Sequence, residues 1–289
     1  MATTTAKAFA DFLTKLEPTS TDQAVISGRS TSVSGYLKTT FDADSDMPLV
    51  STSVIGSGAK GTGIRPVEDV DILAVFGNAQ DVYNKYAGDS KQFLYRVKNA
   101  LDGYRVEVVG ARGQAVRLFY TSGPHADIAP VLPVTGGGYY LPAGDGSWVF
   151  TNPAQDLTWL NERNAALNHQ VKPMVKLAKA WNRTHSRRFR SFHLEVMVAS
   201  AFTTLGANHR QALKVWFAYQ NITVAAPTGG QALDGYMPYG STRRTAAINL
   251  LNSSAERATN ALAAEDRGDH AEAIRLWQII LGSDFPAFG

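Results

Sequence analysis

The sequence predicts an α+β fold of two lobes, a mixed β-sheet with flanking helices and a helical lobe that follows it. Two observations predict this fold. Residues 47–132 alternate short β-type apolar runs with glycine-rich loops, whereas most of the chain after residue 152 has the spacing of amphipathic helices. Residues 133–150 between them are rich in glycine and proline. We therefore expect a core at 1–150 and a helical lobe at 151–289.

Two helical patterns open the chain. Phe9, Phe12 and Leu16 recur at helical spacing, and after a break at Pro18 a second pattern continues to Phe41 as a long spine helix. The sheet lobe should then contain one helix near 79–101 and strands at Leu49–Ile55, Asp69–Phe76, Arg105–Val109, Val116–Tyr120 and Ala126–Leu132.

The joining segment and the helical lobe follow. Residues 133–150 are expected to form a loop or a short hairpin. Asn152 and Pro153 have the residue types of a helix N-cap and of the first helical position. The expected helices are 153–168, 169–184, 192–206, 209–220, 241–267 and 269–281, with a break at 225–240.

Composition narrows the class of protein. The 289 residues are 44% hydrophobic, enough for one large domain or two lobes. Neither a run of about 18 apolar residues nor a signal-peptide pattern is present, so we expect a cytoplasmic protein with no membrane partner. The absence of cysteine excludes disulfides and thiolate-ligated metals, and the six histidines show no paired metal-ligand spacing. Any metal must therefore bind through oxygen ligands.

Positive charge is concentrated in one segment. The net charge is only +3, but residues 172–190 contain no acid and seven cations: Lys172, Lys176, Lys179, Arg183, Arg187, Arg188 and Arg190. On a helical wheel, four of them share one face. Such a stripe suits a nucleoside triphosphate or a nucleic-acid backbone, and a solvated basic face is the alternative.

Three carboxylates form the most informative pattern. Asp69 and Asp71 are two residues apart in the β-type run DVDILAVF, so both point to the same face of a strand. Two such charges side by side repel unless a cation lies between them. Asp127 begins another apolar run, and three carboxylates can hold two divalent ions. Asp69, Asp71 and Asp127 are the predicted metal ligands and catalytic residues.

A glycine-rich loop precedes the acidic pair. Gly56 allows close approach of a phosphate, and Ser57 supplies a hydroxyl that can contact its oxygens. Taken alone, Asp-x-Asp is also found in turns and helix caps. The combination G-S-x3-G-T-x6-D-x-D in a strand context favours a triphosphate site with bound metal.

The stretch GTGIRPVEDVD resembles the cGAS/DncV-like nucleotidyltransferases (CD-NTases) of the polymerase-β-like superfamily. Residues 174–182, 191–195 and 273–286 are similar to later segments of that family. The resemblance implies that Lys179 binds the donor triphosphate, and Lys176 of the same basic stripe is also predicted to bind nucleotide. It implies that Ser191 adds a hydroxyl contact and that Phe192 stacks on the donor base, although core packing is the alternative for Phe192.

The resemblance also implies an activity. The enzyme would join nucleoside triphosphates, ATP among them, into a cyclic di- or trinucleotide messenger with release of pyrophosphate, using two Mg²⁺ ions that Mn²⁺ can replace. The messenger would activate an effector in bacterial defence against phage. Without cysteines the chain cannot build a thiolate-ligated zinc insertion, so we do not expect activation by double-stranded DNA. The alternatives are nucleotidyl transfer to RNA ends or to a small molecule, and a non-enzymatic nucleotide-binding protein.

Overall fold

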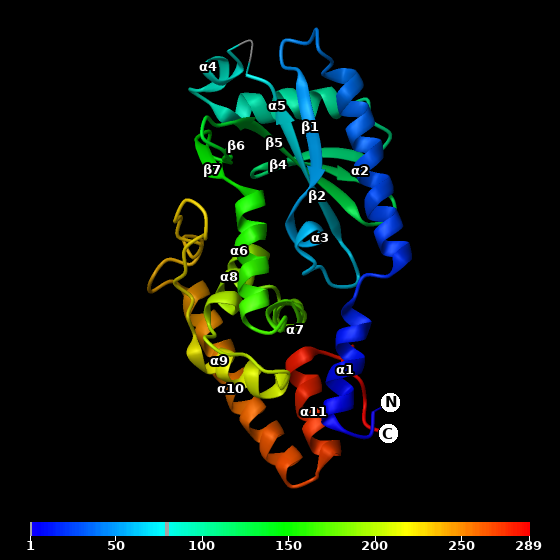
Figure 1. Cartoon of the computed structure of the whole chain (residues 1–289), viewed down its shortest axis with the longest axis vertical. Helices are drawn as coiled ribbons and strands as arrows, with labels where there is room; N and C mark the ends of the chain where they lie inside the picture. The colour runs from blue at the N-terminus through cyan, green and yellow to red at the C-terminus, as the bar shows by residue number, and fades with distance from the viewer. Residues whose placement is uncertain (1, 79–80) are drawn as a thin grey trace. The chain divides into compact units, whose positions relative to one another are not determined.

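The computed structural model describes residues 2–78 and 81–289 (Figure 1). The chain forms two compact units, residues 18–157 and residues 158–289 together with 2–17. This division differs from the predicted one at 150/151, because the first helix belongs to the helical unit and the start of the sixth helix belongs to the sheet unit.

The sheet unit is built on a mixed sheet. Its strand order is β1-β2-β5-β4-β3, with β6 paired to β5 and β7 paired to β6. Only β2 and β5 run parallel; the other pairs are antiparallel. The strands are β1 Leu49–Val54, β2 Asp69–Phe76, β3 Val108–Arg112, β4 Ala115–Phe119, β5 His125–Pro133, β6 Tyr139–Pro142 and β7 Trp148–Thr151.

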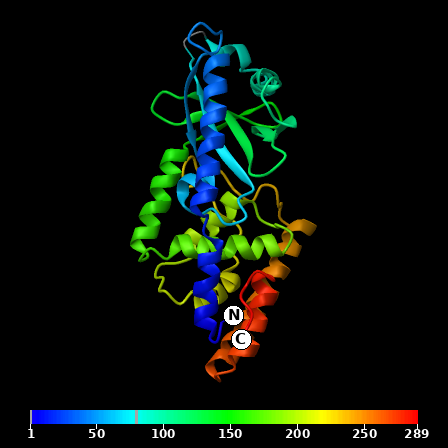
Figure 2. The ribbon, with the colours of Figure 1, turned by 90° about the vertical axis from the view of Figure 1, so that its right-hand side faces the viewer.

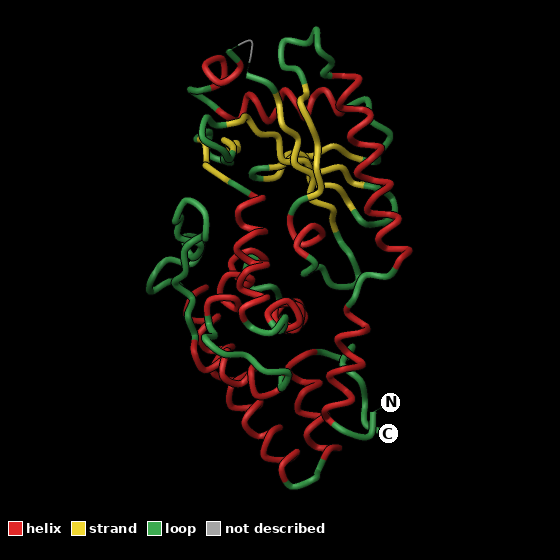
Figure 3. The backbone as a smooth tube through the Cα atoms, viewed as in Figure 1, coloured by secondary structure: helices red, strands yellow, loops and turns green. Residues whose placement is uncertain are grey.

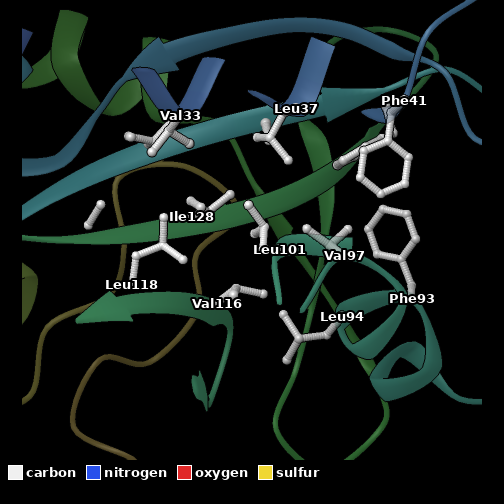
Figure 4. Packing of buried hydrophobic residues seen from close by; sticks show 14 of the residues in the cluster. Val33, Leu37, Phe41, Phe93, Leu94, Val97, Leu101, Val116, Leu118 and Ile128 are labelled. Atoms are coloured by element: carbon white, nitrogen blue, oxygen red, sulfur yellow. The ribbon is translucent and has the colours of Figure 1, made fainter. Parts of the chain in front are cut away.

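One face of this sheet is covered by two helices. These are α2 (Ser20–Thr40), which lies along the sheet in Figures 1 and 2, and α5 (Ser90–Leu101). In β2 the even-numbered residues, such as Val70 and Ile72, are buried beneath them. Figure 4 shows side chains of both helices packed against β4 and β5. The odd-numbered residues face the opposite side, where Leu73 and Val75 form a smaller apolar cluster.

The predicted α+β class is confirmed. Two elements of the sheet unit differ from the prediction, and the joining segment takes one of its two predicted forms. The helix expected at 79–101 is two helices, α4 (Val82–Tyr86) and α5, because Asp89 caps the start of α5; residues 79–80 lie outside the described part of the chain. The strand expected at Arg105–Val109 begins three residues later. Its place is set by the tight turn at Gly113, which has a φ of 63° and joins β3 to β4. Residues 133–150 contain the β6–β7 hairpin, one of the two predicted forms.

The helical unit contains α1 (Thr5–Leu16), most of α6, and the helices α7 to α11 (Figure 3). Phe9 of α1 packs edge to face against Trp277 of α11, with the ring centroids 4.9 Å apart. This contact anchors the first helix in this unit. The bounds of the later helices are α6 Pro153–Ala166, α7 Val171–Thr184, α8 Ser191–Ser200, α9 His209–Tyr219, α10 Thr242–Asp266 and α11 His270–Leu281. No helix within the described ranges is both long and apolar enough to span a bilayer.

Candidate active site

The three predicted carboxylates lie on one face of two adjacent strands. Asp69 and Asp71 are the first and third residues of β2, and Asp127 is directly beside Asp71 in the parallel β2–β5 register. Neighbouring residues in register point to the same face. Because Val70 and Ile72 fill the helix-covered face, the carboxylates occupy the other one. The strand register therefore brings together residues that are 58 and 56 positions apart in the sequence.

The structure adds a cation that the sequence prediction missed. Arg117 of β4 lies opposite Asp127 in the antiparallel register. Its Nε donates to Asp127 Oδ1 at 2.6 Å, and its Nη2 donates to Asp127 Oδ2 and, at 3.1 Å, to Asp69 Oδ2. The alternation of the sequence Ala-Val-Arg-Leu-Phe was the available signal, since buried Val116 and Leu118 turn Arg117 to the carboxylate face.

The pKa values of Asp69 and Arg117 reflect how close these charged groups lie to one another. Burial, and next the charge of Asp127, raise the pKa of Asp69 above its usual range, against the opposing effect of Arg117. Hydrogen bonding to Asp127 raises the pKa of the Arg117 guanidinium. Arg117 therefore stays charged, and the carboxylate face favours positive charge.

The glycine-rich loop lies against the acidic pair. The backbone N–H of Ile55 donates to the carbonyl of Asp71 at 2.9 Å, and Gly56 follows with a φ of 63°. Gly56 and Ser57 begin the short helix α3 (Gly56–Lys60). The carbonyl of Ser57 accepts hydrogen bonds from the N–H groups of Thr62 and Gly63 at 3.1 and 3.2 Å, which fold the loop back on itself.

The donor set fits an oxygen-binding divalent ion. Three carboxylates with no sulfur ligand suit Mg²⁺ or Mn²⁺. Within residues 2–78 and 81–289, however, no three acidic or histidine side chains converge closely enough to hold an ion in the arrangement seen. The guanidinium of Arg117 instead supplies the positive charge to Asp69 and Asp127.

Lys176 and Lys179 lie on α7 of the helical unit, but their surroundings differ. Lys176 is buried, and its Nζ donates to Glu17 Oε1 at the end of α1. Lys179 is only half-buried. The ammonium of Lys176 is therefore already paired with a carboxylate, and the nucleotide-binding roles of Lys176 and Lys179 stay predictions.

Ser191 and Phe192 are the first two residues of α8. Ser191 is exposed and Phe192 is half-buried. Asn182 of α7 holds this helix start in place: its amide donates to the carbonyl of Phe189 at 2.8 Å, and its side-chain oxygen accepts from the Phe189 N–H at 3.0 Å. Asn182 is a structural residue whose role the sequence prediction did not single out.

Two histidines, His193 and His125, form hydrogen bonds that stabilise the fold. His193 is 1% exposed, its Nε2 donates to the Ile222 carbonyl at 2.7 Å, and its Nδ1 accepts from the Tyr236 hydroxyl at 2.8 Å. His193 is therefore a buried residue that links Ile222 and Tyr236 through hydrogen bonds. His125 lies beside Asp69 in register, and its Nδ1 accepts the Tyr120 N–H at 3.3 Å.

A family profile described as the Second Messenger Oligonucleotide or Dinucleotide Synthetase (SMODS) domain matches residues 3–164, more than half of the chain. The chain belongs to the SMODS family. It is thus a cyclic oligonucleotide synthase of the CD-NTase group, as the motif around Asp69 predicted. Residues of both units lie within the match.

Among curated relatives, a cyclic AMP-AMP-AMP synthase of an Acinetobacter strain is 27% identical over 98% of this chain and 86% of the relative. Among solved structures, Vibrio cholerae DncV, a cyclic AMP-GMP synthase, has a TM-score of 0.79 at 11% identity, covering 99% of this chain and 97% of DncV. Escherichia coli CdnC with ATP has a TM-score of 0.74 at 20% identity, covering 98% and 99%. These likenesses confirm the two-part fold.

Proposed function

We propose that this synthase is a Mg²⁺-dependent nucleotidyltransferase that uses ATP and joins nucleotides into a cyclic di- or trinucleotide. The observation that supports this most strongly is the alignment of Asp69, Asp71 and Asp127 on one sheet face, with Gly56 against Asp71. The names of the relatives favour adenine nucleotides, because the Acinetobacter relative is a cyclic AMP-AMP-AMP synthase.

Asp69, Asp71 and Asp127 would hold the divalent ions. Ions bound there would neutralise the triphosphate and make the attacking ribose hydroxyl more acidic. Asp127 would help to accept the hydroxyl proton, since its carboxylate adjoins Asp71 in register. Gly56 and Ser57 would hold the phosphates through backbone N–H groups and a hydroxyl.

Residues of the helical unit would complete donor binding. Lys179 would pair with the triphosphate, Ser191 would donate its hydroxyl, and Phe192 would stack on the base. Lys176 fits this role poorly, because its ammonium is buried and paired with Glu17. We therefore assign Lys176 to the support of α7.

The biological setting is also a proposal. One solved structure that this chain resembles is Escherichia coli CdnC in complex with HORMA, so a protein partner is part of the proposal. The product would act on a cyclic-nucleotide-sensing effector in bacterial antiviral defence, in the cytoplasm and without double-stranded DNA as activator.

The deciding experiment incubates the purified protein with radiolabelled ATP, GTP, CTP and UTP and with Mg²⁺ or Mn²⁺. Products are treated with phosphatase and separated by chromatography, with EDTA and an Asp69→Asn/Asp71→Asn variant as controls. We expect a phosphatase-resistant product from ATP that both controls abolish, because cyclic products have no terminal phosphate.

Other outcomes separate the alternatives. Phosphatase-sensitive products would indicate linear oligomers, and label appearing on added RNA would indicate terminal transfer. A product that persists in EDTA would contradict metal dependence. If all nucleotides stay unchanged with candidate activators present, the proposed reaction is wrong.

A further inference from the structure

Arg117 binds carboxylate oxygens of Asp69 and Asp127 that the proposed metal site would also use. It is the central residue of β4, and both of its neighbours in the strand are fully buried on the helix-covered face. Opposite it, the Asp127 carboxylate accepts a bidentate pair of hydrogen bonds from Nε and Nη2 of Arg117. Asp69 accepts a third hydrogen bond from Nη2. One guanidinium thus links carboxylates from both strands.

The same oxygens would bind a divalent ion. Asp127 uses both Oδ1 and Oδ2 for Arg117, and Asp69 uses Oδ2. The Arg117 side chain is 14% exposed and that of Asp127 is 19% exposed, so water screens their charges poorly. A cation that approaches these oxygens is repelled by the guanidinium, whose charge is permanent.

We propose that Arg117 is a built-in counter-ion that neutralises Asp69 and Asp127 in the metal-free protein and weakens divalent-ion binding until it releases them. This inference rests on the proposed function, because it takes the same carboxylates as metal ligands. Arg117 is in this account a positioning residue.

The test measures Mn²⁺ binding without nucleotide, by the electron paramagnetic resonance signal of free Mn²⁺. Arg117→Met keeps most of the aliphatic stem and removes the charge. We expect Mn²⁺ to bind this variant at least about tenfold more tightly than wild type, because a charge within about 4–6 Å typically shifts the equilibrium of a neighbouring charge by about one to three orders of magnitude. Arg117→Lys, which keeps the charge but loses the two-pronged geometry, should have an intermediate Kd.

A matched control uses another arginine of the same unit. Arg96 Nη2 lies 3.2 Å from Asp46 Oδ1, and this ion pair does not involve the three carboxylates of the proposed metal site. Arg96→Met should bind Mn²⁺ with the wild-type Kd. Asp69→Asn/Asp71→Asn should lose the binding, which assigns the measured ion to this site.

A second readout protects the test against a folding defect. Metal-free Arg117→Met should melt below wild type, and Mn²⁺ should raise its melting temperature by more than it raises that of wild type. An unchanged or weaker Mn²⁺ affinity in Arg117→Met would overturn the inference. If that variant does not fold, Arg117→Lys decides, and a wild-type Kd in it would count against the counter-ion role.

Failure of this inference is distinguishable from failure of the proposed function. Binding is measured without nucleotide, whereas the proposed function is measured by product. If wild type forms a cyclic product and Arg117→Met binds Mn²⁺ no more tightly, only the counter-ion role is wrong. If binding tightens and no cyclic product forms, the counter-ion role stands and the proposed reaction fails.

Discussion

The carboxylate of Asp71 occupies the space that a side chain on Gly56 would need. A Cβ atom built on Gly56 lies 2.0 Å from Asp71 Oδ2, far inside van der Waals contact. The φ of 63° at Gly56 is also one that residues with a Cβ rarely adopt. The loop and the acidic pair therefore depend on each other for their positions.

We predict that Gly56→Ala lowers kcat/KM for product formation by about 100-fold, because a displacement of about 1 Å at a reacting centre can cost that much. Gly58→Ala is the matched control. Its Cβ would lie 3.3 Å from Val54 Cγ1, which a shift of a few tenths of an ångström would relieve, and we expect activity within about twofold of wild type. Equal loss in both variants would show that the loop tolerates no added bulk and that Asp71 is not the reason.

A second prediction separates Lys176 from Lys179. Lys176→Met should lower the melting temperature by about 2–4 °C, roughly 1 kcal/mol, through loss of the ion pair between the buried Lys176 and the exposed Glu17 carboxylate, and leave the KM for ATP unchanged. Lys179→Met should raise that KM with little change in melting. Calorimetry and initial rates measure the two effects.

The control for this pair is Lys15, whose contact with Asp284 joins two exposed side chains. Lys15→Met should shift the melting temperature by less than about 1 °C, since exposed ion pairs contribute little. A large rise in the KM for ATP in Lys176→Met would reverse our assignment and restore Lys176 to the nucleotide site.

Much of the sheet unit could be predicted from the sequence because local patterns determine it. The run from Asp69 to Phe76 matches β2, and its alternation predicts that Asp69 and Asp71 share a face. The position of Asp127 beside Asp71 required the strand register, which depends on long-range packing. The motif as a whole suggested that Asp127 joins the acidic pair, whereas periodicity alone did not place it beside Asp71.

Arg117 and Lys176 show where local pattern is insufficient. Arg117 reads as an ordinary polar residue of an alternating strand until β5 is known to lie beside it. Lys176 shares a helical face with Lys179 by spacing, and the structure adds that Glu17, which follows α1, pairs with Lys176. In both cases a segment distant in sequence determines the partner of the charge.

The third prediction concerns Asp69 in the metal-free protein. Its pKa is raised in the folded state, so its ionised form opposes folding above that pKa, and the penalty disappears as the pH falls below the unfolded value of about 3.9. Asp69→Asn should therefore melt about 1–3 °C above wild type in EDTA at pH 7.5, and at the wild-type temperature near pH 4.

Asp46→Asn should behave in the opposite way. Hydrogen bonding to Lys85 lowers the pKa of Asp46, so its ionised form stabilises the fold above the unfolded pKa, and this stability is lost as the pH falls through the folded value. The variant should be slightly destabilised at pH 7.5. A destabilised Asp69→Asn would show that its contact with Arg117 outweighs burial and the charge of Asp127.

The last prediction concerns His193 and the acid limit of stability. Burial lowers the pKa of His193, and the Nε2 proton is already committed to the Ile222 carbonyl, so Nδ1 must stay unprotonated to accept from Tyr236. The folded state therefore takes up this proton less readily than the unfolded chain. Stability should be fully present above the unfolded pKa of about 6.5 and should decrease as the pH falls through the lower folded value.

Urea unfolding of wild type and His193→Gln at pH 7.5 and 5.5 measures this effect. The variant should be less stable than wild type at pH 7.5, because Gln cannot reproduce both hydrogen bonds at the same positions. It should lose less stability between the two pH values, since residue 193 no longer takes up a proton on unfolding. The half-buried His185 and His209, whose pKa values are also lowered by burial, would account for the loss that remains. An equal decrease in both proteins would assign the acid limit to those two histidines.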